Sequence, residues 1–203
     1  MQPVSLTDFL DFVARTGSPR LTKVREVQRR DDYEPHVDFW KPLRDGIVRF
    51  HRNGSPSKHQ LDELVTEATS KRRPRYAESI QGYKKFLGRK DVTWFKPPVG
   101  NWTQHGLRIR VNPELGLMVN GTRHIVKLYS KKKQLKKLHG ADMIILLMHE
   151  ALSRRVDGAT RFAVLDVARG KLFSETSPSD ELLPLLVGEA ACFVSIWEDL
   201  QSV

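Results

Sequence analysis

The first ninety residues carry apolar side chains at the three- and four-residue spacing that is typical of amphipathic helices. The apolar stripes run over residues 6–13, 37–50, 61–68 and 76–87. Ser5 and Asp8 form a capping-box pattern in front of the first stripe, and Pro42 fits the first turn of the second helix. Residues 17–30 begin as a loop in this interpretation and end strongly basic. We therefore predict a helical region over residues 1–90.

The pattern changes near residue 91 from helical spacing to alternation. Residues 107–111 and 115–119 alternate between apolar and polar side chains, as the two faces of a strand require. Asn120-Gly121 is a strong hairpin-turn signal, so residues 122–129 are expected to return as the partner strand. Residues 92–106, which are rich in Pro, Gly and Trp, are expected to form a short strand and a structured loop.

The remaining segments complete the predicted fold. An apolar helix centred on residues 143–152 precedes a short buried strand at 162–167, and an amphipathic helix follows as far as Leu200. The class is α/β or α+β, with a helical N-terminal part before a mostly antiparallel sheet and flanking helices, in the order β-β-β-α-β-α. A boundary near residue 90 separates region 1–90 from region 91–203. The two regions pack as one compact domain or stand apart.

The predicted hairpin places particular side chains opposite one another. A two-residue turn pairs Val119 with Thr122 and, counting back, sets Glu114 against Lys127. The face that carries Leu115, Leu117, Val119, Val126 and Leu128 is the expected core face. One interpretation of Glu114 and Lys127 is a cross-strand ion pair on a half-exposed face, which contributes a fraction of a kcal/mol.

A second interpretation starts from a resemblance. The order helix, three-stranded meander, helix and strand over residues 75–170, with Pro113-Glu114 followed by Ile125-Val126-Lys127, resembles the PD-(D/E)XK nuclease fold. In that family a proline-acid step and an acid-x-lysine hold a divalent metal, and the lysine orients water or stabilises charge. The resemblance implies Glu114 and Lys127 as catalytic residues, with Mg²⁺ or Mn²⁺ as cofactor if the chain is an active nuclease.

The sequence departs from that family at one ligand. Ile125 stands where the second acid belongs, and a lone carboxylate that faces a lysine is a poor site for Mg²⁺, which prefers several oxygen ligands. A carboxylate on a helix, such as Glu78, could supply the missing ligand. The resemblance therefore favours a degenerate nuclease-like fold over an active nuclease. A single cysteine and scattered histidines predict no structural zinc site.

The charge is distributed unevenly along the chain. The net charge is +10, and residues 1–140 hold 29 Lys/Arg and 14 Asp/Glu, whereas residues 141–203 hold five and ten. A basic excess confined to one part of a chain is typical of a protein that binds a polyanion, with nucleic acid as the expected partner and an anionic membrane as a rarer one. The alternative is a well-solvated surface without such a partner.

The basic residues cluster in short runs, which are the candidate phosphate contacts. The predicted nucleic-acid-binding residues are Lys71, Arg72, Arg73, Arg75, Lys84, Lys85, Arg89, Lys90, Lys131, Lys132, Lys133, Lys136 and Lys137. The loop from Trp94 to Trp102 interleaves aromatic rings with Lys96. These rings either stack on exposed bases or pack the loop onto the sheet.

The remaining expectations concern environment and partners. One cysteine, no visible signal peptide and no long apolar run predict a cytoplasmic protein that does not enter a membrane. The acidic C-terminal helix is a candidate surface for a protein partner. The leading hypothesis is a non-catalytic nucleic-acid-binding accessory protein. The alternatives are a metal-dependent nuclease that uses Glu114 and Lys127, and a protein-interaction module with a basic surface.

Overall fold

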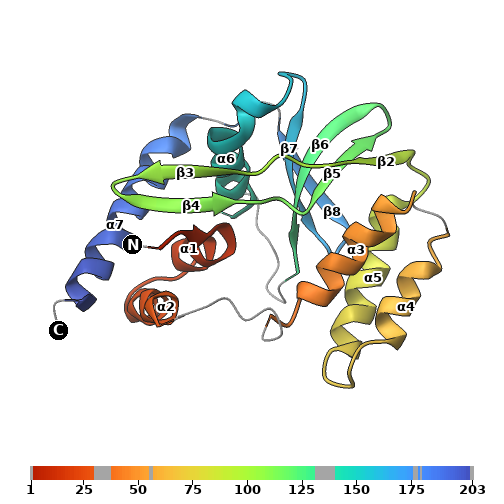
Figure 1. Cartoon of the computed structure of the whole chain (residues 1–203), viewed down its shortest axis with the longest axis horizontal. Helices are drawn as coiled ribbons and strands as arrows, with labels where there is room; N and C mark the ends of the chain where they lie inside the picture. The colour runs from red at the N-terminus through yellow and green to blue at the C-terminus, as the bar shows by residue number, and fades with distance from the viewer. Residues whose placement is uncertain are drawn as a thin grey trace.

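The computed structural model describes residues 2–29, 38–54, 57–130, 140–175, 178 and 180–201. Within those ranges the chain forms seven α-helices and two mixed sheets, so the fold belongs to the α+β class (Figure 1). The expected arrangement, a helical N-terminal part followed by a sheet with flanking helices, is confirmed. The boundary expected near residue 90 falls between the fifth helix and the strand that follows it.

The N-terminal helices begin where local chemistry favours a helix start. They are α1 (Leu6–Val13), α2 (Ser18–Gln28), α3 (Lys41–Arg52), α4 (Gln60–Thr66) and α5 (Arg73–Leu87). The Ser5 hydroxyl accepts a hydrogen bond from the Asp8 backbone N–H at 3.1 Å, and Pro42 lies in the first turn of α3, so both predicted starts are confirmed. The prediction that residues 17–30 begin as a loop is wrong beyond Gly17, because α2 begins at Ser18 with Pro19 in its first turn.

The larger sheet has five strands in the order β2-β5-β6-β7-β8. Their bounds are β2 (Val92–Phe95), β5 (Leu115–Val119), β6 (Thr122–Tyr129), β7 (Arg161–Asp166) and β8 (Lys171–Glu175). The predicted register of the hairpin is confirmed, since Val119 pairs with Thr122 and Leu115 with Val126. Helix α6 (Asp142–Leu152) connects β6 to β7, the one parallel pair of this sheet.

The smaller sheet has three strands in the order β1-β4-β3, with β1 (Val4–Ser5), β4 (Leu107–Val111) and β3 (Gly100–Gln104). The loop predicted over residues 92–106 is therefore wrong in its second half, because residues 100–104 form β3 and pair with β4. Pro97-Pro98 lies between β2 and β3, so this stretch of chain passes from one sheet to the other. Strand β8 was not expected at all.

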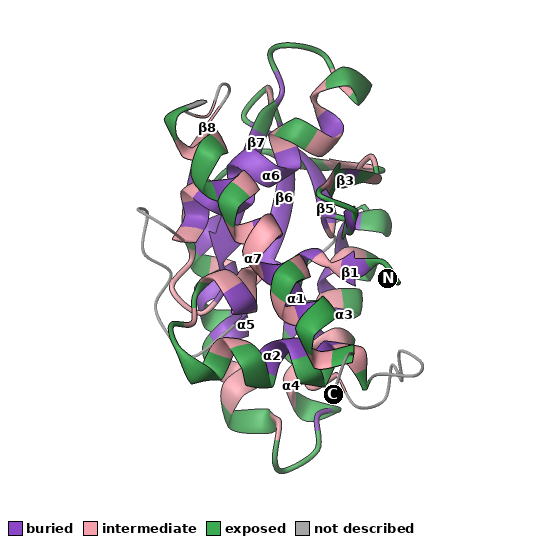
Figure 2. Ribbon diagram, turned by 90° about the vertical axis from the view of Figure 1, so that its left-hand side faces the viewer, coloured by how far each residue is buried: buried purple, intermediate pink, exposed green. Residues whose placement is uncertain are grey.

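Both faces of the five-stranded sheet are covered (Figure 2). Helices α3 to α5 pack on the face that carries Leu115, Leu117 and Val126, which confirms the predicted core face. Ile125, Phe162 and Val164 on the opposite face join a second core with α1, α2, α6 and the C-terminal helix α7 (Leu183–Gln201). The prediction of a half-exposed face around Glu114 and Lys127 is therefore wrong. The hydrophobic pattern of one hairpin indicated one buried face and did not indicate that helices cover the other face as well.

Helix α5 contacts the turn between β7 and β8 through two glycines. A Cβ atom on Gly82 would lie 2.2 Å from the Val167 carbonyl oxygen, and one on Gly170 would lie 2.4 Å from the Gly82 carbonyl oxygen. Helix and turn therefore touch through their backbones.

None of the described helices is both long enough and apolar enough to cross a bilayer.

Candidate functional site

Glu114, the predicted catalytic carboxylate, lies just before β5 and faces Lys127 on β6. The Lys127 Nζ atom is 2.5 Å from Oε1 of Glu114, and the Leu128 backbone N–H donates to Oε2 at 2.8 Å. The Arg44 Nε atom of α3 lies 3.6 Å from Oε1. The expected contact between Glu114 and Lys127 is present, and only 13% and 10% of their side chains are exposed.

Arg44 connects this pair to the start of α3. Its Nη2 atom donates to Oδ2 of Asp38 at 2.6 Å, while Oδ1 of Asp38 accepts the backbone N–H groups of Trp40 and Lys41. We call Asp38, Arg44, Glu114 and Lys127 the Glu114 cluster. It combines two carboxylates with two cations and joins the first turn of α3 to the β5–β6 hairpin.

The Glu114 cluster does not fit a divalent metal ion. Both carboxylate oxygens of Glu114 already accept a hydrogen bond, and a metal ion would have to displace the Lys127 ammonium from Oε1. Glu78 is exposed on α5 and pairs with Arg75 at 3.4 Å. No group of three His, Cys, Asp or Glu side chains that could hold a metal ion occurs among the described residues. The geometry is that of a structural tie between a helix and a hairpin.

The predicted basic runs lie at opposite ends of α5. Lys71, Arg72, Arg73 and Arg75 precede or begin this helix, and Lys84, Lys85, Arg89 and Lys90 end or follow it. A helix of this length separates them by roughly 20 Å. The structure therefore does not bring the two runs together. The third run, Lys131, Lys132, Lys133, Lys136 and Lys137, lies outside the described residues.

Several of these cations already have partners within the protein. Arg73 donates to the carbonyls of Thr66, the last residue of α4, and of Ala68 just after it. The Lys84 ammonium lies 2.6 Å from both carboxylate oxygens of Asp62. Arg72 lies over the ring of Phe39, and Lys90 bonds the carbonyl of Phe86. Lys71, Lys85 and Arg89 are exposed and form no ion pair with any described residue.

The two tryptophans of the predicted stacking loop pack inside the protein. Trp102 is buried in the core that contains α1 and α6, and Trp94 packs against the core formed by α3 to α5. The interpretation in which these rings hold the chain onto the sheet is confirmed. The aromatic ring of this segment that borders a pocket is Phe95.

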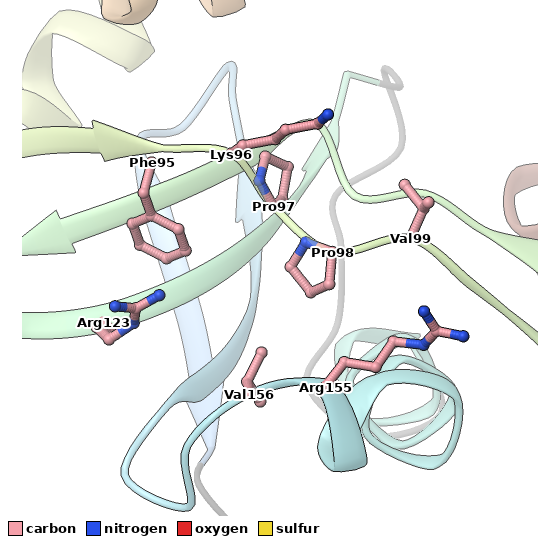
Figure 3. Close-up of a pocket in the computed structure, with 8 residues that line it drawn as sticks. All are labelled: Phe95, Lys96, Pro97, Pro98, Val99, Arg123, Arg155 and Val156. Carbon is pink, nitrogen blue, oxygen red and sulfur yellow. The ribbon is translucent and has the colours of Figure 1, made fainter.

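This pocket lies at the junction between β2 and β3 and has a volume of about 430 Å³ (Figure 3). We call it the junction pocket, and it is lined by Phe95, Lys96, Pro97, Pro98, Val99, Arg123, Arg155 and Val156. Arg155 and Val156 come from the single 3-10 turn after α6 (Ser153–Arg155) and the residue behind it. The lining thus combines three cations with five apolar side chains.

Two further cations were missed by sequence reasoning. Arg108 and Arg110 point outward from β4 while Leu107, Ile109 and Val111 are buried beneath them. Their cross-strand partners on β3 are Thr103 and Asn101, and neither arginine forms an ion pair with a described residue. The alternation in residues 107–111 was a sufficient signal that both arginines share one solvent-facing surface.

The acidic residues of α7 are partly used inside the fold. Glu189 accepts from Arg20 of α2 at 2.8 Å, whereas Glu198 and Asp199 are exposed. Comparison with known protein families, with curated proteins and with solved structures found no match to this chain.

Proposed function

We propose that the protein binds nucleic acid through its basic surface and does not cleave it. The observation that carries this proposal is the lack of acidic partners in the sheet region. Residues 84–130 contain nine Lys/Arg and two Asp/Glu. Five of these cations are exposed and form no ion pair with a described residue, namely Lys85, Arg89, Lys96, Arg108 and Arg110. Exposed cations without carboxylate neighbours favour binding to phosphate.

The outer face of β3 and β4 carries two of these cations on one strand. Arg108 and Arg110 are held about 7 Å apart on one strand by the two-residue repeat, and the buried side of that strand fixes their backbone. Asn101 and Thr103 beside them add hydrogen-bonding groups. Cations and small polar groups on a rigid strand suit contacts to the phosphate-sugar chain, which position a protein without reading sequence.

The Glu114 cluster supports the non-catalytic part of the proposal. Mg²⁺-dependent cleavage needs carboxylate oxygens that are available to the ion, and those of Glu114 are engaged by Lys127, Arg44 and the Leu128 N–H. The strands β2, β5 and β6 are neighbours in the sheet and are followed by α6 and β7. The expected first strand of the meander, residues 107–111, is instead β4 of the smaller sheet, and β2 takes its place beside β5. The relationship to a degenerate nuclease-like core stays a prediction.

Anisotropy of a fluorescent oligonucleotide titrated with the protein tests the proposal. We expect binding at low salt that weakens steeply as salt rises, because each phosphate contact releases counterions. The double variant Arg108→Gln/Arg110→Gln should reduce the logarithmic salt slope by about 2. The matched control Arg25→Gln/Arg29→Gln removes two exposed charges from α2 and the region behind it and should leave most of the slope intact.

Three results would contradict the proposal. Absence of binding at low salt would remove nucleic acid as the partner and would favour a protein-interaction module, with an acidic partner for the basic surface. Equal effects of the two double variants would mean that net charge alone is responsible. Cleavage of the oligonucleotide by the wild-type protein with Mg²⁺ or Mn²⁺ would show that the protein is a nuclease.

A further inference from the structure

The junction pocket has a flat cationic wall made by Phe95 and Arg123. The Arg123 guanidinium carbon lies 4.2 Å from the centre of the Phe95 ring. The ring itself covers Gly116 of β5, where an added Cβ would approach a ring carbon to 2.6 Å. Three neighbouring strands therefore hold this stack, with the ring from β2, the space beneath it from β5 and the guanidinium from β6. Guanidinium planes and aromatic rings are the groups on which nucleobases stack.

The opposite part of the pocket is apolar, and two of its residues have no backbone N–H. In Figure 3 Pro98 points toward Val156, while the Phe95 ring points toward Arg123 and the Lys96 ammonium points away from the pocket. Pro97 and Pro98 have no N–H groups, so this wall offers packing surface without a pattern of hydrogen-bond donors. Such a lining can hold the face of a flat ring but cannot read its edge, which favours binding without sequence preference.

Arg155 supplies the charge that the apolar wall lacks. In Figure 3 its guanidinium lies on the side of the pocket opposite Arg123. Arg155 is exposed and forms no ion pair with a described residue, whereas Arg123 lies 3.4 Å from Asp157. The two arginines that border the pocket thus have one carboxylate within ion-pair distance among the described residues, and the pocket favours a ligand that carries negative charge next to a flat apolar group.

We propose that the junction pocket holds one nucleotide unit, with its base against the Phe95–Arg123 stack and Pro98 and its phosphate on Arg155. The nucleotide unit belongs to a single-stranded nucleic acid or is a free nucleotide. Binding of a single-stranded nucleic acid rests on the proposed function and narrows it to single strands. Bases stacked inside a duplex cannot enter a side pocket without being unpaired. Single strands should therefore bind more tightly than duplexes of the same length.

The experiment compares three ligands on three proteins. A labelled thymidine strand of about 20 nucleotides and the corresponding duplex are titrated by anisotropy, and adenosine 5′-monophosphate by amide chemical shifts. The proteins are wild type, Arg155→Gln and the control Arg25→Gln, which removes an equally exposed charge from α2. We expect Arg155→Gln to weaken single-strand binding roughly tenfold, and Arg25→Gln to weaken it about twofold or less. Circular dichroism and melting curves verify that both variants are folded.

The outcomes separate this proposal from the proposed function. Equal binding of strand and duplex, or equal effects of Arg155→Gln and Arg25→Gln on both the strand and the mononucleotide, would overturn the pocket while leaving nucleic-acid binding in place. If neither nucleic acid binds but the mononucleotide binds and requires Arg155, the pocket is supported as a site for free nucleotide and the proposed function is wrong. If none of the three ligands binds at low salt, both proposals are wrong.

Discussion

Lys127 and Arg123 lie on the same face of strand β6, four residues apart, and the structure uses them in opposite ways. Lys127 is 10% exposed and pairs at 2.5 Å with Glu114, which also accepts a backbone N–H and lies near Arg44. Arg123 is 43% exposed, stacks on Phe95 and borders an open pocket. The first cation is enclosed in a charge-balanced cluster, and the second keeps part of its charge available to solvent.

The difference separates a cation that stabilises the fold from a cation that remains available for the proposed binding. Removing a charge from water costs free energy, which only close partners offset, so the Glu114 cluster should be sensitive to the loss of any member. The cations of the junction pocket remain hydrated and should be nearly neutral for folding. Substitutions should therefore separate the two regions by what they change: the free energy of unfolding in one case and the affinity in the other.

The largest effect is expected for Glu114→Ala. This substitution leaves the Lys127 ammonium without its closest carboxylate and should lower the free energy of unfolding by about 3–5 kcal/mol, measured by urea denaturation. The exposed Glu63 of α4 provides the control, and Glu63→Ala should change stability by less than about 0.5 kcal/mol. The double variant Glu114→Ala/Lys127→Met should be more stable than Glu114→Ala alone. Equal losses in all three variants would contradict the structural role of the cluster.

A somewhat smaller effect is expected when the pH is lowered, because of a second enclosed polar pair. His51 of α3 is buried, and its Nε2 atom lies 2.5 Å from the hydroxyl of Tyr83 on α5. Burial lowers the pKa of His51 to about 4 and raises that of Tyr83 above its usual value.

Below pH 6.5 the unfolded chain therefore binds a proton at His51 that the folded protein does not. The stability that the neutral His51 imidazole contributes is complete above pH 6.5. It is lost as the pH falls from 6.5 through about 4. The loss amounts to roughly 3 kcal/mol. An imidazole NMR titration should place the pKa of His51 near 4, and a His51 pKa near 6.5 would refute this prediction.

The smallest stability effect is expected in the junction pocket. Arg155→Gln should change the free energy of unfolding by less than about 0.5 kcal/mol, because Arg155 is exposed and has no ion pair with a described residue. Arg123→Gln should cost up to about 1 kcal/mol, because it also removes the stack on Phe95. Differential scanning calorimetry measures the change. A loss above about 2 kcal/mol in Arg155→Gln would show that this arginine is structural and would remove the contrast with Lys127.

Local signals in the sequence predicted a substantial part of the fold. The Asn120-Gly121 turn sets the register of its hairpin alone, so the contact between Glu114 and Lys127 followed from counting residues. Strand β3 was mistaken for a loop because Pro97, Pro98 and Gly100 stand where a strand is not expected. Strand β8 follows a turn in which Gly170 has a positive φ of 63°. No Asn-Gly or Asp-Gly pair marks this turn in the sequence, so the hairpin of β7 and β8 was not predicted.

The candidate site depends on contacts that separate parts of the chain make. Arg155 borders the pocket because the 3-10 turn after α6 lies at the same pocket as Phe95 of β2 and Arg123 of β6, and no pattern near residue 155 indicates these neighbours. The burial of Glu114 likewise requires α3, which is about seventy residues earlier in the chain. Runs of basic residues along the sequence did not predict a shared surface, since the two runs around α5 lie at opposite ends of that helix.

Pro97 and Pro98 also affect how the edges of the two sheets can pair with another molecule. Strand β2 is one outer strand of the larger sheet and β3 is one outer strand of the smaller sheet, so the chain from Val92 to Gln104 follows an edge of each sheet in succession. An uninterrupted row of backbone donors along such an edge would invite pairing with a strand of another molecule. Two successive residues without an N–H break that row at its middle. The prolines that line the pocket thus also limit edge-to-edge aggregation.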